Sequence, residues 1–360
     1  MARRKNTYIF APDPVRRKNS GCLALLFAIA AAAVLLIFLS NEALNRKVLL
    51  VTEKIPVMSL DKAYEGFSVL HISDLHGEDV GTDEATWRSL LHGKRFDAVV
   101  LTGDMVGKAG NYAPLVSLIH SLRTIKAEIP IYFVAGDSDP PAIVSTYRGT
   151  SEVYADWITA AQRAGATYLD VPTSQQTGKS LVWFVPEYLY NIDVAGSAAS
   201  LLHQKEDMEA RGVQYEAEGG ASYRALLARL DAMQRAAEAV KGITAKDLQI
   251  AVTHVPLEVE YVRNALEWAT SDSIFSVRQI QLVLAGHYTG GQWRFLGLGP
   301  VYVPDRGWFP GDPGIVGFQR INSINQYITA GLGASPFYAM PGRLFNAPSA
   351  ALLSFTARIQ

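Results

Sequence analysis

The 360-residue chain contains one cysteine, Cys22, so it forms no disulfide within itself and holds no metal site built from several cysteines. An excess of charge of either sign is also lacking, because 33 basic and 34 acidic residues nearly cancel. Six basic residues and one acidic residue fall within the first 40 positions, which leaves 27 basic and 33 acidic residues beyond them. Binding to nucleic acid requires a basic surface. The composition therefore predicts no nucleic-acid partner.

Long apolar runs are absent except at one place, residues 21–40, which also carry no charge. A run of about 20 apolar residues is long enough to cross a bilayer. Six basic residues precede it, and the positive-inside rule then places residues 1–20 in the cytoplasm and residues 41–360 outside. The alternative is a cleaved signal peptide, but the run is longer than a typical signal core and no small-x-small cleavage site follows it. We expect a single-pass anchor in a bacterial cell membrane with an extracytoplasmic domain.

Five short apolar runs along the rest of the chain are bounded by glycine or polar residues, a pattern typical of buried strands. They are residues 69–72, 98–101, 131–135, 248–252 and 280–285. Helical spacing in 86–93 and 114–125 fits crossovers between parallel strands, and a further helix is expected over 152–164. A strand is expected over 181–185, and 47–58 is a candidate first edge strand.

Each of the five runs is followed directly by carboxylate or imidazole side chains. The residues are Asp74 and His76, Asp104, Asp137 with Ser138 and Asp139, His254, and His287. Ligands in open α/β sheets bind just past the carboxyl ends of strands, so these side chains are expected to converge. Carboxylate oxygens together with imidazoles suit Mn, Fe or Zn. Two such ions about 3.5–4 Å apart are a usual arrangement for hydrolysis.

At these residues the chain resembles the calcineurin-like metallophosphoesterases, in particular their membrane-anchored bacterial branch, from about residue 67 to 354. The resemblance implies an α/β fold with a two-sheet sandwich flanked by helices, preceded here by one transmembrane helix. It also implies one or two divalent ions. By position, Asp74 and His76 would hold the first metal, Asp104 would bridge, and Asp137, His254 and His287 would hold the second. The segment 327–353 resembles the closing strands of that branch.

Three positions depart from the pattern of the family. Asp137 stands where asparagine is usual, and Ser138 replaces the histidine that usually protonates or stabilises the leaving group, so the catalytic residue is unknown. Thr289 replaces the second histidine of the last motif, which would be a first-metal ligand. Asp139, which orients the catalytic histidine in the family, has lost that partner. Glu78 is a candidate substitute ligand, although an exposed loop glutamate is the commoner role.

The expected organisation is a linker with a first strand over 41–66, followed by a phosphoesterase-like domain over 67–360. Residues 197–242 read as two helices and look like an insertion, either a cap over the site or a helix pair packed on the sheet. After residue 297 a loop rich in glycine, proline and aromatic residues makes Arg306 and Trp308 candidate substrate contacts. The alternative is that its aromatic residues form the loop's own small core.

Two functions remain open from the sequence. The first is a membrane-anchored phosphoesterase that hydrolyses a phosphate monoester or diester by metal-activated water. Its partner would be a phosphorylated small molecule or a lipid- or envelope-linked ester, because of the anchor. The second is an impaired pseudo-phosphoesterase that acts as a metal- or ligand-binding surface protein. His71, inside the first predicted strand, is expected to be a buried structural residue.

Overall fold

The computed structural model describes residues 20–144, 154–213, 220–269, 273–295 and 298–357. The chain divides into two compact units, Met1–Ala43 and Leu44–Gln360. Helix α1 runs Ser20–Asn45, and within it Leu23–Asn45 is long and apolar enough to cross a membrane. A signal sequence near the N-terminus meets the same criterion, so the helix is either a single span or such a sequence.

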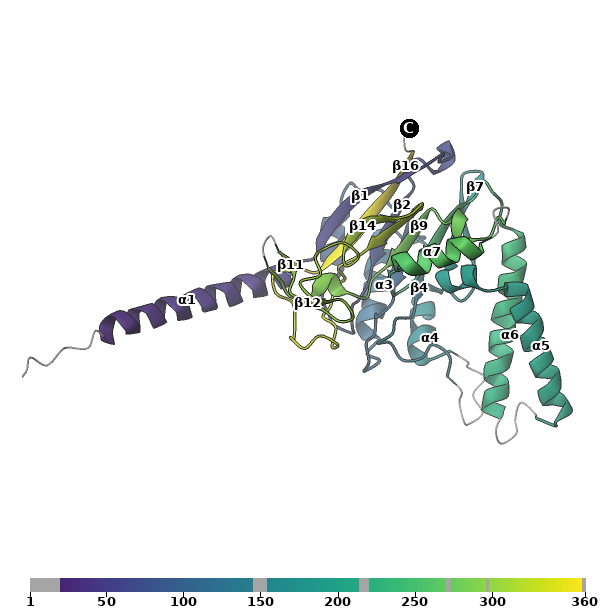
Figure 1. The fold of residues 1–360 in the computed structure, drawn as a ribbon, viewed down its shortest axis with the longest axis horizontal. Helices are drawn as coiled ribbons and strands as arrows, with labels where there is room; N and C mark the ends of the chain where they lie inside the picture. The colour runs from purple at the N-terminus through teal and green to yellow at the C-terminus, as the bar shows by residue number, and fades with distance from the viewer. Residues whose placement is uncertain (1–19, 145–153, 214–219, 270–272, 296–297, 358–360) are drawn as a thin grey trace, which may run out of the picture. The chain divides into compact units, whose positions relative to one another are not determined.

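The second unit is built on two six-stranded sheets (Figure 1). The first sheet has the order β1-β16-β2-β3-β4-β5. Its strands are β1 Leu49–Val57, β16 Ser349–Ala357, β2 Ser68–Ile72, β3 Ala98–Thr102, β4 Ile131–Val134 and β5 Thr167–Tyr168. Strands β2 to β5 run parallel, and β16 is antiparallel to β2 and parallel to β1. The predicted first edge strand is confirmed, because β1 lies at the edge of this sheet.

The second sheet has the order β14-β15-β9-β8-β7-β6. Its strands are β14 Gly317–Ile321, β15 Ile324–Ile328, β9 Leu282–Ala285, β8 Leu248–Val252, β7 Ser180–Pro186 and β6 Thr173–Thr177. The four inner strands run parallel, and the edge strands β14 and β6 are antiparallel to their neighbours. Strand β9 begins two residues later than predicted, because the 3₁₀ turn η3 over Val277–Gln279 ends at Ile280.

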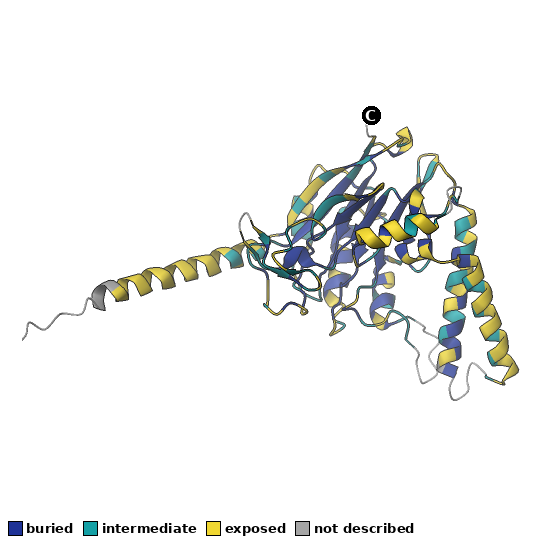
Figure 2. Ribbon diagram, in the orientation of Figure 1, coloured by how far each residue is buried: buried dark blue, intermediate teal, exposed yellow. Residues whose placement is uncertain are grey.

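The inner strands β2, β3, β4, β8 and β9 are largely apolar, because both of their faces are covered. Successive side chains point to opposite faces, so Val100 of β3 enters the core between the sheets while Val99 and Leu101 enter the outer core. Helices α2 Glu84–Leu90, α3 Ala113–Ile125 and α4 Asp156–Arg163 cover the first sheet. Helices α6 Gly220–Lys241 and α7 Val259–Trp268 cover the second. Figure 2 shows the buried strands enclosed by these layers. The fold is therefore the expected two-sheet sandwich flanked by helices.

The segment in which two helices were predicted forms α5 Val194–Ala210 and α6. Helix α6 joins the outer core of the second sheet through Met233, Ala236 and Ala237. Helix α5 packs along α6 and buries only Val194 among its own residues (Figures 1 and 2). The pair is thus packed on the sheet through α6, while α5 forms an outer arm.

The long loop that was predicted after residue 297 contains short strands. They are β11 Gly299–Pro300, β12 Tyr302–Val303 and β13 Gly307–Trp308. Strand β10 Arg294–Phe295, which precedes the loop, pairs with β11, and β12 pairs with β13, so that two hairpins form. A small core of Tyr288, Val303, Ile315 and Tyr338 holds them on the domain. The remaining short elements are η1 Lys62–Tyr64, η2 Glu187–Asn191 and η4 Thr289–Gly291.

Candidate metal centre

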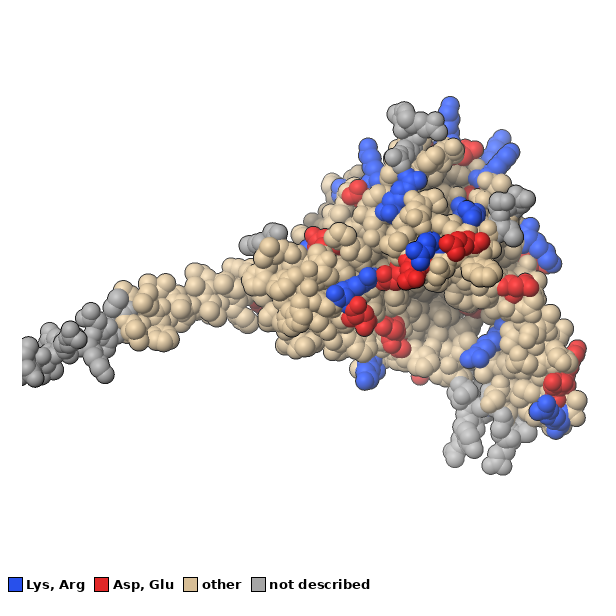
Figure 3. Space-filling view, in the orientation of Figure 1, with Lys and Arg blue, Asp and Glu red and all other residues tan. Residues whose placement is uncertain are grey.

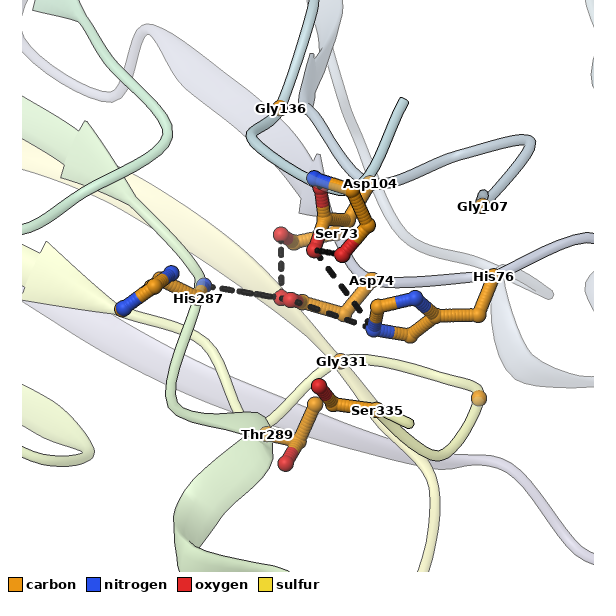
Figure 4. A network of polar contacts seen from close by, with 12 residues as sticks. Ser73, Asp74, His76, Asp104, Gly107, Gly136, His287, Thr289, Gly331 and Ser335 are labelled. Atoms are coloured by element: carbon orange, nitrogen blue, oxygen red, sulfur yellow. Dashed lines mark hydrogen bonds and ion pairs between the residues drawn. The ribbon is translucent and has the colours of Figure 1, made fainter. Parts of the chain in front are cut away.

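Five parallel strands of the two sheets end at one edge of the sandwich, and the predicted ligands follow them there. Asp74 and His76 come after β2, Asp104 after β3, Asp137 after β4, His254 after β8 and His287 after β9. Polar contacts between them cross from one sheet to the other (Figure 4). The carboxyl ends of parallel strands meet because all five run in the same direction, which is why ligands spread over more than 200 residues come together.

The backbone of this edge is unusual. Asp74, His76, Asp104 and His287 all have positive φ, at 53°, 51°, 53° and 77°. Residues other than glycine are uncommon in this region and cost of order 1–3 kcal/mol each when held there. The loops are nevertheless fixed, because the backbone N–H of Asp74 donates to Gly103 and that of His76 donates to Asp104, at 3.0 and 2.7 Å. Such strain clusters at functional sites.

Two glycines of the motifs are needed for close approach. A Cβ at Gly136 would overlap the Asp104 carboxylate, and a Cβ at Gly286 would overlap the Ser73 hydroxyl beside Asp74. Any larger residue at either place would displace a predicted ligand. Gly136 therefore lets the loops after β3 and β4 approach, and Gly286 lets the strand ends of the two sheets come into contact.

Asp137, His254 and His287 form one group of ligand atoms. His254 Nε2 lies 3.0 Å from Asp137 Oδ1 and 3.3 Å from His287 Nδ1. His254 Nδ1 lies 2.8 Å from the carbonyl oxygen of Thr102, and a carbonyl only accepts, so Nδ1 carries the proton. In the neutral ring the lone pair of Nε2 then faces Asp137 and His287. This is the orientation that a histidine ligand requires.

Asp74, His76 and Asp104 form the second group. His76 Nε2 lies 3.8 Å from Asp74 Oδ1 and 3.7 Å from Asp104 Oδ2. Both ring nitrogens of His76 are buried and have no hydrogen-bond partner among the described residues. A buried imidazole without partners is costly unless something binds it. Its surroundings therefore fit a cation between these carboxylates.

Asp104 connects the two groups. Its Oδ2 lies 3.3 Å from His254 Nε2 and 3.7 Å from His76 Nε2. One carboxylate thus faces both sets of ligand atoms, as the position of the predicted bridging ligand requires. Its other oxygen, Oδ1, accepts a hydrogen bond of 2.8 Å from the Ser138 backbone N–H.

The electrostatics of the site also call for a cation. Burial raises the pKa of Asp74. Although burial lowers the pKa of His254, its hydrogen bonds to Asp104 and Asp137 raise that pKa well above the usual range. Hydrogen bonds from His254 and His287 hold the pKa of Asp137 far below its usual range. Three carboxylates in one place thus demand positive charge, which a proton or a divalent ion supplies.

Ser138 and Asp139 have roles that the sequence did not reveal. The Ser138 hydroxyl donates to Asp104 Oδ2 at 2.6 Å. The buried Asp139 carboxylate accepts from the backbone N–H groups of Met105, Val106, Gly107 and Gly136, at 2.9 to 3.2 Å. Asp139 therefore keeps a structural role without a histidine beside it, because it ties the loop after β4 to the loop that carries Asp104.

Thr289 and Glu78 do not extend the first group. The buried Thr289 hydroxyl donates to Gln292 Oε1 at 3.4 Å, and in Figure 4 it points away from Asp74 and His76. Glu78 accepts a hydrogen bond of 3.0 Å from the backbone N–H of Ala334. The candidate role of Glu78 as a substitute ligand is not supported by this contact.

A pocket of about 340 Å³ opens beside Asp137 and His287. It is lined further by Tyr288, Pro304, Asp305, Ser335, Phe337 and Tyr338. Arg306 and Trp308, the predicted substrate contacts, do not line it. Arg306 donates to the Tyr288 hydroxyl at 3.1 Å and pairs with Glu258, so it supports the pocket wall. Trp308 packs at a tilt against Tyr302, with 5.1 Å between ring centroids, and is 69% exposed.

Two further residues shape the site from beneath. His71 is fully buried, its Nε2 lies 2.9 Å from Thr102 Oγ1, and burial lowers its pKa to about 3, so it is neutral as expected of a structural residue. Arg343 was missed by sequence reasoning. Its buried guanidinium donates to the carbonyl oxygens of Ala330, Gly331, Gly333, Thr289 and Asn346. Only its place in a Gly-rich segment hinted at this, since an arginine there is usually exposed.

The sequence model of the calcineurin-like phosphoesterases matches residues 67–288, which include all six predicted ligands. The chain belongs to this family. Members are phosphoesterases that typically bind divalent metals, and the two ligand groups are candidate places for them.

Individual relatives are distant. An uncharacterized metallophosphoesterase of Bacillus subtilis, YkoQ, is 28% identical over 91 residues, which are 24% of this chain and 34% of that protein. The match therefore spans about a third of the relative's length. Among solved structures, the phosphopantetheinyl hydrolase PptH of Mycobacterium tuberculosis matches 74% of this chain and 89% of its own, with 13% identity and a TM-score of 0.34.

Proposed function

We propose that this protein is a metal-dependent hydrolase of phosphate monoesters or diesters. The observation that carries the proposal is the meeting of two ligand groups at Asp104, with both nitrogens of His76 buried and unpartnered among the described residues. Membership of a phosphoesterase family supports the reaction class. Mn, Fe and Zn all suit a set of carboxylates and imidazoles.

Asp74, His76 and Asp104 would hold one ion, and Asp104, Asp137, His254 and His287 the other. Bound there, divalent ions would supply Lewis acidity and activate water at neutral pH. The chain itself fixes the ligands: Thr102 sets the tautomer of His254, and Ser138 orients Asp104. The pocket beside Asp137 and His287 would receive the rest of the ester.

The leaving group receives little help from the residue at the usual histidine position. The Ser138 hydroxyl proton is already donated to Asp104, so it is not free for a departing oxygen. General acid catalysis contributes typically about 10²- to 10⁴-fold. We therefore expect the enzyme to favour esters whose leaving group is already a stable anion, such as an aryl oxide or a phosphate.

The test is metal content and turnover of an aryl phosphodiester by the purified protein. His254→Ala with His287→Ala should remove metal and lower turnover at least about 100-fold, since even partners behind metal ligands are worth about 10- to 100-fold. The matched control is His92→Ala with His120→Ala, two exposed histidines on the first sheet's helical side, which should change neither. Equal metal content in both double variants would overturn the proposal.

The alternative, a phosphoesterase fold that only binds a metal or ligand, is favoured by one observation, the commitment of Ser138 to Asp104. Full metal content in the wild type without turnover of any aryl ester would support it. Turnover that follows metal content across the variants would exclude it.

We further propose that residues 21–40 anchor the protein in the cell membrane with residues 41–360 outside the cytoplasm. The apolar helix and the six basic residues before it support this topology. An anchored enzyme meets esters at or near the bilayer, so a lipid- or envelope-linked phosphoester is the favoured substrate class.

A further inference from the structure

Five large apolar side chains are exposed on or beside the two hairpins and on the loop that contains Phe337. They are Phe295, Leu298, Trp308, Phe309 and Phe337, here called the apolar rim. Each is more than half exposed. Phe337 lines the pocket itself, and Pro304 and Asp305, in the same hairpin as Trp308, line it too. Clustered exposed apolar side chains beside a site indicate a surface that another body covers.

The apolar rim lies outside the small buried core beneath the hairpins. Their own small core consists of Tyr288, Val303, Ile315 and Tyr338, and none of the five rim residues belongs to it. The alternative in which the loop's Trp and Phe form its own small core is therefore wrong. Trp308 and Phe309 are left on the outside, where contact with water is unfavourable.

The rim residues are held outward by ordered backbone. Phe309 has φ of +50°, a conformation that a bulky residue adopts rarely. Its backbone N–H donates to Val301, and that of Val301 donates to Trp293, at 2.9 and 2.8 Å. These bonds join the two hairpins into one small layer that displays Trp308 and Phe309 together.

The chain enters the domain close to this layer. Asn45, the last residue of the candidate membrane span, donates from Nδ2 to the carbonyl oxygen of Arg343 at 2.8 Å. The next residue, Leu344, bridges to Trp293 and accepts from the backbone N–H of Arg294. Two hydrogen bonds, one from Asn45 to Arg343 and one from Arg294 to Leu344, thus connect the end of the span to the start of the hairpins. The chain therefore leaves the candidate span next to a segment that pairs with the hairpins.

Charge points to a neutral partner. The two arginines beside the rim are neutralised, because Arg294 pairs with Asp312 and Arg306 pairs with Glu258. On the face shown in Figure 3, few charged side chains lie over β11 and β12, and lysines and arginines gather at the far end of the domain near β16 and β7. Aromatic side chains without free cations are typical of contact with the interfacial region of lipids rather than with an acidic partner.

We propose that the apolar rim is a membrane-docking surface, which rests on the lipid bilayer and places the mouth of the metal pocket at the lipid–water interface. The substrate class that this arrangement serves is a phosphoester of an amphiphile, whose phosphoryl group stands at the bilayer surface. The statement about substrate rests on the proposed hydrolase function, whereas the docking itself does not.

The surface need not bind strongly alone. The candidate span ends within a few residues of the domain, so docking of the rim is an intramolecular event. The effective concentration of the bilayer at the rim is therefore high. Weak interfacial insertion of a few aromatic rings is then enough to orient the pocket.

Vesicle binding by residues 44–360 tests the docking. This part folds without the span, because every core residue lies between Val48 and Phe355. We expect it to co-sediment with vesicles of neutral phosphatidylcholine at both low and high salt. Trp308→Ser with Phe309→Ser should lower the vesicle affinity roughly tenfold or more, because two large apolar side chains are withdrawn from the lipid.

The matched control is Val259→Ser with Trp268→Ser on α7, where Trp268 is 87% exposed. It should bind vesicles as the wild type does, and thermal melting should show all three proteins folded. No binding by the wild type, equal loss in both variants, or binding that requires anionic lipid and disappears in salt would each overturn the proposal. Vesicle binding without turnover of any soluble ester would support docking and refute the hydrolase, so the two failures are distinguishable.

Discussion

The Ser138 hydroxyl lies 2.6 Å from Asp104 Oδ2, the same oxygen that lies 3.3 Å from His254 Nε2. A residue at the position of the usual leaving-group histidine is therefore engaged with the carboxylate that both ligand groups share. Burial alone would raise the pKa of Asp104, but the hydrogen bonds from His254 and Ser138 hold it below its usual range. Ser138 thus holds Asp104 in place, and its hydroxyl proton is committed to that carboxylate.

Ser138→His should restore a proton donor next to Asp139. We expect turnover of alkyl phosphoesters to rise, by up to about 10²-fold, and turnover of aryl esters to change little, because only a basic leaving oxygen needs the proton. The measurement is the dependence of kcat on leaving-group pKa. Ser138→Ala is the control and should leave that dependence as steep as in the wild type. An equal gain for both ester classes would contradict this role.

Thr289→His should strengthen the first ligand group if the imidazole turns toward His76, and raise metal content toward two ions per chain. The site is fully buried, so we also expect the larger ring to destabilise the fold by about 1–3 kcal/mol. Thr289→Val, which keeps the shape, should leave metal content unchanged because the native hydroxyl bonds Gln292. Metal loss in the valine variant would show that the hydroxyl is itself a ligand.

Asp139→Asn should destabilise the protein although it touches no ligand atom. The amide replaces a carboxylate that accepts four backbone hydrogen bonds, and it brings N–H groups to face other donors. We expect a loss of about 1–3 kcal/mol in the free energy of unfolding, measured by denaturant titration. Asp207→Asn, at an exposed position of α5, should be neutral. Equal stability of the two variants would show that the four backbone hydrogen bonds to Asp139 do not stabilise the fold.

His71 should make the protein acid-sensitive. Its folded pKa is about 3, against an ordinary 6.5, because burial disfavours the charged ring. Below pH 6.5 the unfolded chain binds a proton that the folded chain does not, so stability falls as the pH falls toward 3, by at most about 1.4 kcal/mol per pH unit. His71→Gln, which can still bond Thr102, should flatten that slope by one proton in urea titrations between pH 6 and 4. An unchanged slope would mean that His71 is protonated in the folded state.

Protease added to intact cells or spheroplasts should remove residues 41–360 and leave a short anchored fragment. This expectation follows from the proposed topology, in which the basic residues before the apolar helix stay in the cytoplasm. Digestion only after lysis would show the opposite topology. Release of the whole domain into the medium without protease would indicate a cleaved signal sequence.

The sequence by itself determined the strands and the order of the ligands. Apolar runs such as 248–252 are buried on both faces, so their composition alone predicts them as strands. The strands before Asp104 and His254 then bring these two side chains to the same edge of the sandwich. The roles of Asp139 and Arg343, in contrast, could not be predicted from the sequence. Their partners are backbone groups of other loops, and neither periodicity nor spacing encodes which loop lies beside them.

Only the tertiary structure decided which contacts are made by the residues that depart from the family pattern. Ser138 could be seen as a lost histidine, but its bond to Asp104 exists only because β3 and β4 end side by side. Arg306 and Trp308 could be predicted as substrate contacts, yet a glutamate from the loop before α7 pairs with the arginine and the hairpin turns the indole outward. Side-chain direction in a long loop depends on contacts distant in sequence, whereas the direction of a strand end is fixed by the sheet.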